Sequence, residues 1–113
     1  MSLYTSNLYG KLLITDDAVR TAAGATALES YGVFGLYGWR YDAKKKKPLG
    51  NFKKAIRIDA RDNRIYIEIN VILKYGVSID AVTESLRGAI RYNVELFTGM
   101  TVEVININVL GIK

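Results

Sequence analysis

The sequence contains neither cysteine nor histidine among its 113 residues. Without cysteine, the chain can form no disulfide, iron–sulfur cluster or thiolate metal site. The absence of histidine removes the commonest base at neutral pH and the commonest metal ligand. Catalysis would have to use carboxylate, lysine or tyrosine groups, and the sequence shows no convergent cluster of them. We therefore expect no enzyme, no catalytic residues, no cofactor and no metal ion.

Long hydrophobic runs are missing as well. No stretch of 18 apolar residues is present, which is roughly what a membrane-spanning helix needs. Residues 1–7 are polar and uncharged, and they lack the basic and apolar regions of a signal peptide. We expect a cytoplasmic protein, which could still reach a membrane through a partner.

The remaining composition is that of one folded domain. Half of the residues are hydrophobic and 24% are charged, which is ordinary for a globular protein. A chain of this size buries roughly two-thirds of its unfolded surface, so it needs no disulfide or metal to fold. We predict a single domain over residues 1–113.

Positive charge is concentrated in residues 40–64, which hold ten of the sixteen basic residues and three acids, a net charge of +7. The tetralysine run at residues 44–47 lies within residues 39–51, which contain the only proline and are predicted to be a flexible loop. Such a run can be a solvated loop, or it can attract anionic lipid head groups or nucleic acid. The candidate residues for binding a partner or an anionic surface are Trp39, Arg40, Tyr41, Lys44, Lys45, Lys46, Lys47, Lys53 and Lys54.

Three other patterns have a simpler structural interpretation. Residues 32–35 and 35–38 spell the GxxG of a KH-type RNA-binding loop, but they fall on a predicted strand, where glycine permits bulges. Tyrosine precedes glycine four times, which favours rings packed over turns. Asp80 and Glu84 share one helix face, but two carboxylates rarely suffice for a divalent cation, so a solvated face explains them better.

Capping signals and hydrophobic periodicity predict two helices. Thr15 and the two acids after it predict a helix over residues 16–30, whose inner stripe would be Val19, Ala22, Ala23, Thr26 and Ala27. Ser78 predicts the start of a second helix that ends at Thr98, before a left-handed cap at Gly99. Its buried stripe would be Ile79, Val82, Leu86, Ala89, Ile90, Asn93, Val94 and Phe97.

Alternating apolar residues predict five strands, at residues 8–14, 31–38, 52–60, 65–75 and 100–110. Val33 and Phe34 would supply the bulk of the second. Asp62 and Asn63 tolerate the positive φ of a two-residue hairpin turn. In the last strand the alternation changes parity, which predicts a one-residue bulge near Val104. The order strand, helix, three strands, helix, strand predicts an α/β (α+β) two-layer sandwich, with both helices on one face of a mostly antiparallel sheet.

Two blocks that cover about two-thirds of the chain carry recognisable motifs. In residues 10–38 the motifs are Ile14-Thr15, Ala22-Ala23, and Gly32-Val33 with Gly35-Leu36. In residues 65–112 they are Tyr75-Gly76-Val77, Thr98-Gly99-Met100, and Val104 with Asn106-Ile107 and Gly111. In this order and spacing the blocks resemble the alkaline shock protein or Gls-type general stress protein family, the envelope stress response family of Gram-positive bacteria.

The resemblance implies a cytosolic protein tied to cell-envelope homeostasis or to alkaline and general stress. Some members of this family are held at the membrane by an anchor protein, and others are linked to control of fatty-acid synthesis. We predict a non-catalytic adaptor whose protein partners could include a membrane anchor or a lipid-synthesis enzyme. A homodimer could form through the alanine-rich helix or an edge strand. The alternative is a nucleic-acid-binding module that uses residues 40–64.

Overall fold

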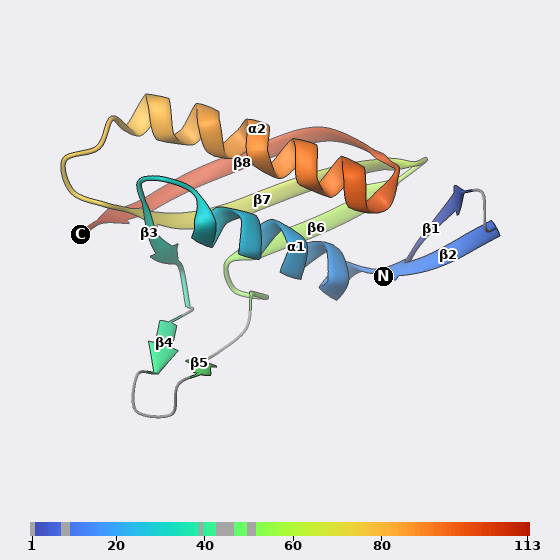
Figure 1. The fold of residues 1–113 in the computed structure, drawn as a ribbon, viewed down its shortest axis with the longest axis horizontal. Helices are drawn as coiled ribbons and strands as arrows, with labels where there is room; N and C mark the ends of the chain where they lie inside the picture. Colours follow the sequence, from blue (N-terminus) through green and yellow to red (C-terminus); the bar gives the residue numbers. More distant parts are fainter. Residues whose placement is uncertain (1, 8–9, 39, 43–46, 50–51) are drawn as a thin grey trace.

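The computed structural model of the protein describes residues 2–7, 10–38, 40–42, 47–49 and 52–113, with side chains for residues 15–38 and 52–113. Two helices and eight strands follow one another along this part of the chain (Figure 1). Their bounds are β1 (Ser2–Asn7), β2 (Gly10–Thr15), α1 (Asp16–Glu29), β3 (Val33–Leu36), β4 (Arg40–Asp42), β5 (Lys47–Leu49), β6 (Ile56–Arg61), β7 (Arg64–Leu73), α2 (Ile79–Thr98) and β8 (Thr101–Ile112).

Strand β7 is the centre of a four-stranded sheet. β6 and β3 both pair with it antiparallel. The N–H of Asn70 donates to Ala55 O at 2.7 Å, and its C=O accepts from Tyr37 N–H at 3.1 Å. Because both groups of one residue point to the same side of a strand, β6 and β3 lie end to end along one edge of β7. β8 takes the other edge and runs parallel to β7, which the crossover through α2 allows.

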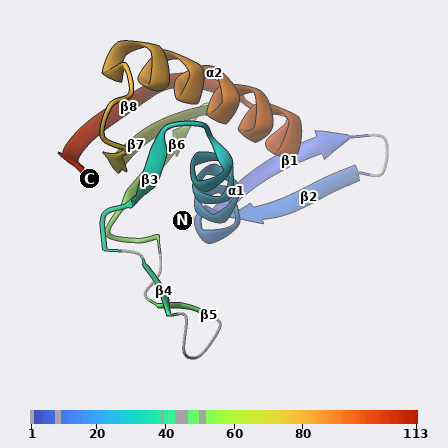
Figure 2. The same cartoon turned by 60° about the vertical axis from the view of Figure 1, so that its left-hand side comes forward.

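Both helices pack on one face of this sheet (Figures 1 and 2). The buried residues of β7 alternate along the strand and point toward the helices, while the side chains between them lie on the open face. These buried residues are Ile65, Ile67, Ile69, Val71 and Leu73. The predicted two-layer α+β sandwich, with a mostly antiparallel sheet, is thereby confirmed.

The predicted helix caps and the turn are present. Thr15 Oγ1 accepts a hydrogen bond from Ala18 N–H at 3.1 Å, and Ser78 Oγ accepts one from Ala81 N–H at 3.3 Å. Gly99 has a left-handed φ of 71°, and its N–H donates to Glu95 O. Asp62 and Asn63 have φ values of 50° and 65°, as the turn of the β6–β7 hairpin requires.

Two strand predictions need correction. The strand predicted at residues 8–14 corresponds to β2, but β2 pairs with β1 in a separate two-stranded sheet. The strand predicted from residue 52 begins only at Ile56, because Ala55 and Ile56 both donate their N–H to Phe52 O and form a turn. Within residues 39–51, predicted as a loop, β4 and β5 pair antiparallel, and residues 43–46 lie outside the described part of the chain.

Several predicted core positions are also wrong. The pairing of β3 with β7 shifts register between Val33 and Gly35, which leaves Phe34 54% exposed, and Leu36 fills the core instead. This bulge fits the structural interpretation of the strand glycines. On α2 the buried stripe runs every four residues and ends at Thr98, so that Ile79, Asn93 and Phe97 are exposed.

The predicted bulge in β8 is confirmed, with Glu103 as the extra residue. Val102 and Ile105 are buried on the helix side, as predicted. Val104 lies opposite Tyr66 and faces away from the helices, so it does not contribute to the core.

Two glycines on the helices should respond oppositely to alanine. A Cβ at Gly24 of α1 would lie 2.5 Å from the Phe52 ring, whereas one at Gly88 of α2 meets no atom within 4 Å. We expect Gly88→Ala to raise the free energy of unfolding by roughly 0.5–1 kcal/mol. Gly24→Ala should lower it by about 1–2 kcal/mol, since overpacking outweighs the gain in helix propensity. Urea denaturation measures both, and Phe52→Ala in the Gly24→Ala background should remove the conflict.

Candidate interaction surfaces

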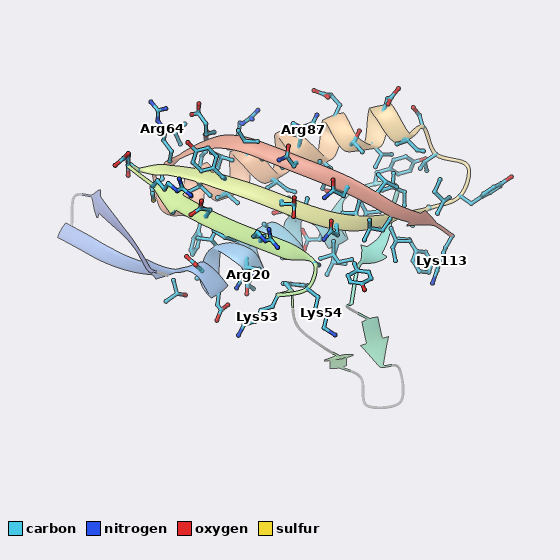
Figure 3. All side chains as sticks on the ribbon, turned by 180° about the vertical axis from the view of Figure 1, so that it is seen from behind. Arg20, Lys53, Lys54, Arg64, Arg87 and Lys113 are labelled. Atoms are coloured by element: carbon cyan, nitrogen blue, oxygen red, sulfur yellow. The ribbon has the colours of Figure 1, made fainter. Side chains whose placement is uncertain are left out.

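The nine predicted site residues are only partly described. Trp39, Lys44, Lys45 and Lys46 lie outside the described residues. For Arg40, Tyr41 and Lys47 the structure gives the backbone, in the β4–β5 hairpin. Lys53 and Lys54 are exposed in the turn before β6, on the side of the sheet nearest that hairpin (Figure 3). The site itself stays a prediction.

The basic residues at 53–64 do not form one surface. Lys53 and Lys54 precede β6, while Arg61 and Arg64 flank the turn at its other end. A six-residue strand spans roughly 20 Å, and Figure 3 shows Arg64 at the far end of the sheet from both lysines. Arg61 Nη2 lies 3.0 Å from Asp59 Oδ2, and Arg64 Nη1 lies 3.8 Å from a Glu103 carboxylate oxygen. Strand β6 therefore separates Lys53 and Lys54 from Arg61 and Arg64, and Arg57 lies within the strand, in a hollow that it shares with Asp59 and Glu68.

The start of α1 borders a hollow of about 400 Å³ lined by residues of both charges. Arg20 forms an ion pair with Asp17, and its Nε donates to Ile56 O at 2.9 Å. This arginine therefore holds α1 against β6. The lining residues are Thr15, Asp16, Asp17, Arg20 and Lys53. Because two acids balance two bases, the hollow has no net charge to attract an anion.

The open face of the sheet has a shallow hollow of about 140 Å³. Tyr66 and Val104 supply its apolar lining, and its charged lining residues are Arg57, Asp59 and Glu68. Further along, Asn108 Nδ2 donates to Asn70 Oδ1 at 3.0 Å across β7 and β8. This face is mixed in character, with polar groups that already pair with one another. Tyr66 is the one aromatic ring among the described residues that line this hollow, which is too few to make a stacking platform for bases.

The other predicted motifs have structural roles. The first GxxG starts at the turn after α1 and runs into β3, whereas the KH loop joins two helices. Glu84 Oε2 accepts a hydrogen bond from Arg87 Nη1 at 2.8 Å. Tyr31 and Tyr75 are largely exposed, so the prediction that these rings pack over turns is wrong. Across the described ranges, no three acidic side chains gather in a way that could hold a metal ion.

The outer face of α2 carries two large apolar side chains that sequence reasoning missed. Tyr92 is 67% exposed and Leu96 is 73% exposed, and they lie one helical turn apart. We call these two residues the α2 ridge. Arg91 and Glu95 stand beside it and bond to β8. The signal that could have found it is two large apolar residues outside the predicted buried stripe.

No helix in the described part of the chain is long and apolar enough to cross a membrane.

Comparison with known proteins places the chain in a family. The alkaline shock protein 23 family, described as having a cell envelope-related function, matches residues 4–113. Two uncharacterised proteins of Bacillus subtilis are similar: YloU is 24% identical over 100% of this chain and 97% of its own length, and YqhY is 29% identical over 92% and 78%. The uncharacterised protein Spy1614 of Streptococcus pyogenes is 26% identical over 92% of this chain and 88% of its own. These matches confirm the resemblance, and the chain belongs to the alkaline shock protein 23 family.

Proposed function

We propose that this protein is a non-catalytic adaptor in the cell-envelope stress response or in envelope and lipid homeostasis, and that it acts by binding protein partners. It would work in the cytoplasm and reach the membrane through a partner. The cell envelope-related description of the family supports the setting. The absence of cysteine and histidine from the sequence supports the non-catalytic role.

The observation that carries the proposal is the α2 ridge. An exposed apolar side chain is ordinary by itself, but adjacent exposed apolar side chains on one face of a helix are a feature of protein–protein interaction sites. Tyr92 combines an apolar ring with a hydroxyl, and tyrosine is enriched in interfaces. The arginine and glutamate beside the ridge both bond to Val102 of β8, so these bonds anchor the helix that presents the ridge on its β8 side. A partner would bury the two side chains without rearranging the helix.

The test is an affinity capture from a Gram-positive lysate, with membrane and soluble fractions kept separate. The baits are the native chain, a Tyr92→Ala/Leu96→Ala variant, and a variant with alanine at all four lysines of residues 44–47. We expect the native bait to recover a membrane anchor or a lipid-synthesis enzyme. With that partner purified, the ridge variant should bind at least about 30-fold more weakly, since truncating each of two interface anchors costs about 1 kcal/mol or more.

The lysine variant separates this proposal from the nucleic-acid alternative. If it recovers the same partner, the tetralysine run is a solvated loop. If the native bait recovers chiefly nuclease-sensitive nucleic acid and the lysine variant loses it, the adaptor proposal is wrong. In that case the affinity should also fall steeply with salt, because each phosphate contact releases a counterion.

A further inference from the structure

The outer edge of β8 pairs with no strand in the described part of the chain, and α2 side chains cover only its first half. β8 pairs with β7 on one side, and no described strand pairs with its other side. The backbone groups of Lys113 point inward, toward β7, since its N–H donates to Leu73 O at 2.9 Å and its C=O accepts from Tyr75 N–H at 3.1 Å. The outward positions are marked by Val102 and Ile105, whose backbone groups bond to side chains of α2.

Helix α2 covers the first half of this edge with charged side chains. Glu95 Oε2 accepts from Val102 N–H at 2.8 Å, and Arg91 Nε lies 3.4 Å from Val102 O. One turn earlier, Arg87 Nε donates to Ile105 O at 3.3 Å. These side chains occupy the positions that a neighbouring strand would need, so they prevent pairing along this half.

The second half of the edge has no such cover among the described residues. Ile107 and Val109 lie two and four residues after Ile105 in the same strand, so their backbone N–H and C=O groups point outward as well. Val104–Ile112 contains no charged residue and no proline, although these are the usual devices that protect an exposed edge. Ile107 and Val109 are half-buried against the core, and they lie between the two bulges of β8, where the pairing with β7 is regular.

We propose that the β8 edge pairs with β8 of a second copy of this chain, antiparallel, with Asn108 on the two-fold axis. In this register Ile107 lies opposite Val109 of the second copy, and each exchanges two backbone hydrogen bonds with its opposite residue. Asn108 lies opposite its own equivalent on the open face, next to Asn70, which would extend the existing asparagine pair across the axis. Ile105 need not pair, so its bond with Arg87 is kept.

The sequence around Asn108 favours a second copy over an unrelated strand. When residues 107–109 of the two copies run antiparallel, each β-branched residue lies opposite a β-branched residue of the other copy, and each Asn108 lies opposite the other Asn108. Both are favourable cross-strand pairs. No like charges meet, because the segment is uncharged. The alanine-rich helix α1 is the less suitable surface for a dimer, because its stripe already packs on α2 and the sheet, with Asn93 Nδ2 donating to Thr26 Oγ1 at 3.0 Å.

Sedimentation equilibrium across micromolar to millimolar concentrations tests the pairing. We expect the native chain to approach twice its mass of 12.6 kDa. Val109→Pro removes one outward N–H without breaking the β7–β8 ladder, since proline is tolerated where the N–H faces away from the sheet. This variant should stay folded by circular dichroism and weaken the dimer at least 10-fold. Leu96→Ala, on the ridge, should leave the dimer unchanged.

Cysteine cross-linking tests the register, because the native chain has no cysteine. Under mild oxidation with diamide, Asn108→Cys should give a disulfide-linked dimer, since directly opposed residues of this kind have Cβ atoms about 4.5–5.5 Å apart. Asn106→Cys, whose equivalent lies several residues away, should not. A native chain that is monomeric at every concentration would overturn the proposal, as would a dimer that Val109→Pro leaves intact. The adaptor proposal is tested separately, and it fails if the ridge variant binds the purified partner as tightly as the native chain does.

Discussion

Replacing Leu86 by alanine is expected to lower the free energy of unfolding by about 3–4 kcal/mol, within the range of about 2–5 kcal/mol for a leucine truncated inside a core. Leu86 belongs to the buried stripe of α2 and is 0% exposed. The substitution removes three heavy atoms from a position where α2 faces the sheet, and the surrounding strands limit how far the cavity can collapse. Because small domains unfold with only about 5–15 kcal/mol, this loss is a large share of the stability.

Leu96→Ala is the matched control, because it makes the same chemical change on the same helix. Leu96 stands in solvent, so its truncation should change stability by less than about 0.5 kcal/mol. Urea denaturation followed by circular dichroism gives both values. Equal losses at the two positions would show that α2 does not bury the face that carries Leu86.

The contrast between these leucines also bears on function. A substitution that abolishes partner binding is informative only when the protein stays folded. Because Leu96 contributes little to the core, a loss of binding in its alanine variant reports on the α2 ridge itself. Leu86→Ala would reduce binding as well, but through unfolding and in proportion to the unfolded fraction.

Local signals in the sequence were sufficient for the ends of the helices and for one hairpin. Thr15 and Ser78 cap their helices because a side-chain hydroxyl at this position can accept a hydrogen bond from an N–H of the first turn, which has no partner within the helix. Asp62 and Asn63 adopt positive φ because short polar side chains can hydrogen-bond to the backbone there. Each of these predictions depends on residues within one turn of each other, so no tertiary information was needed.

Positions that depend on tertiary pairing were predicted less well. Alternation alone could not show that β2 pairs with β1 and not with the main sheet, since both arrangements give the same pattern. Phe34 was predicted, with Val33, to supply the bulk of its strand, but the bulge opposite β7 turns it outward. On α2, a stripe spaced every four residues drifts around the helix, so that Thr98 is buried and Phe97 is not.

The candidate surfaces show the same limit. Counting charges identified residues 40–64 as a basic region, but the extended strand β6 lies within that range and separates the basic residues at its two ends. The outward edge of β8 could not be read from the sequence, because which backbone groups face β7 depends on the two bulges in the pairing. Tyr92 and Leu96 lie outside the predicted stripe, and only the structure shows that nothing in the described chain covers them.

Gly32→Ala is expected to lower the free energy of unfolding by about 3 kcal/mol. Gly32 has a φ of +84°, and a Cβ there would lie 2.6 Å from Val82 Cγ2. The left-handed backbone costs a non-glycine residue roughly 1–2 kcal/mol, and forcing apart packed groups costs about 1–3 kcal/mol. Neither residue can easily move to relieve this clash, because Gly32 O accepts a hydrogen bond from Lys74 N–H at 2.8 Å and Val82 is buried at the start of α2.

Gly76→Ala separates the two costs, because Gly76 has a similar φ of +90° but a Cβ there meets no atom within 4 Å. It should lose only the backbone share, about 1–2 kcal/mol. Adding Val82→Ala to Gly32→Ala should recover part of the difference, since the smaller side chain removes the clash while leaving the strained φ in place. If Gly32→Ala and Gly76→Ala destabilise the protein equally in urea denaturation, close packing between the α1–β3 turn and α2 does not contribute, and the glycine at position 32 is required for its backbone conformation alone.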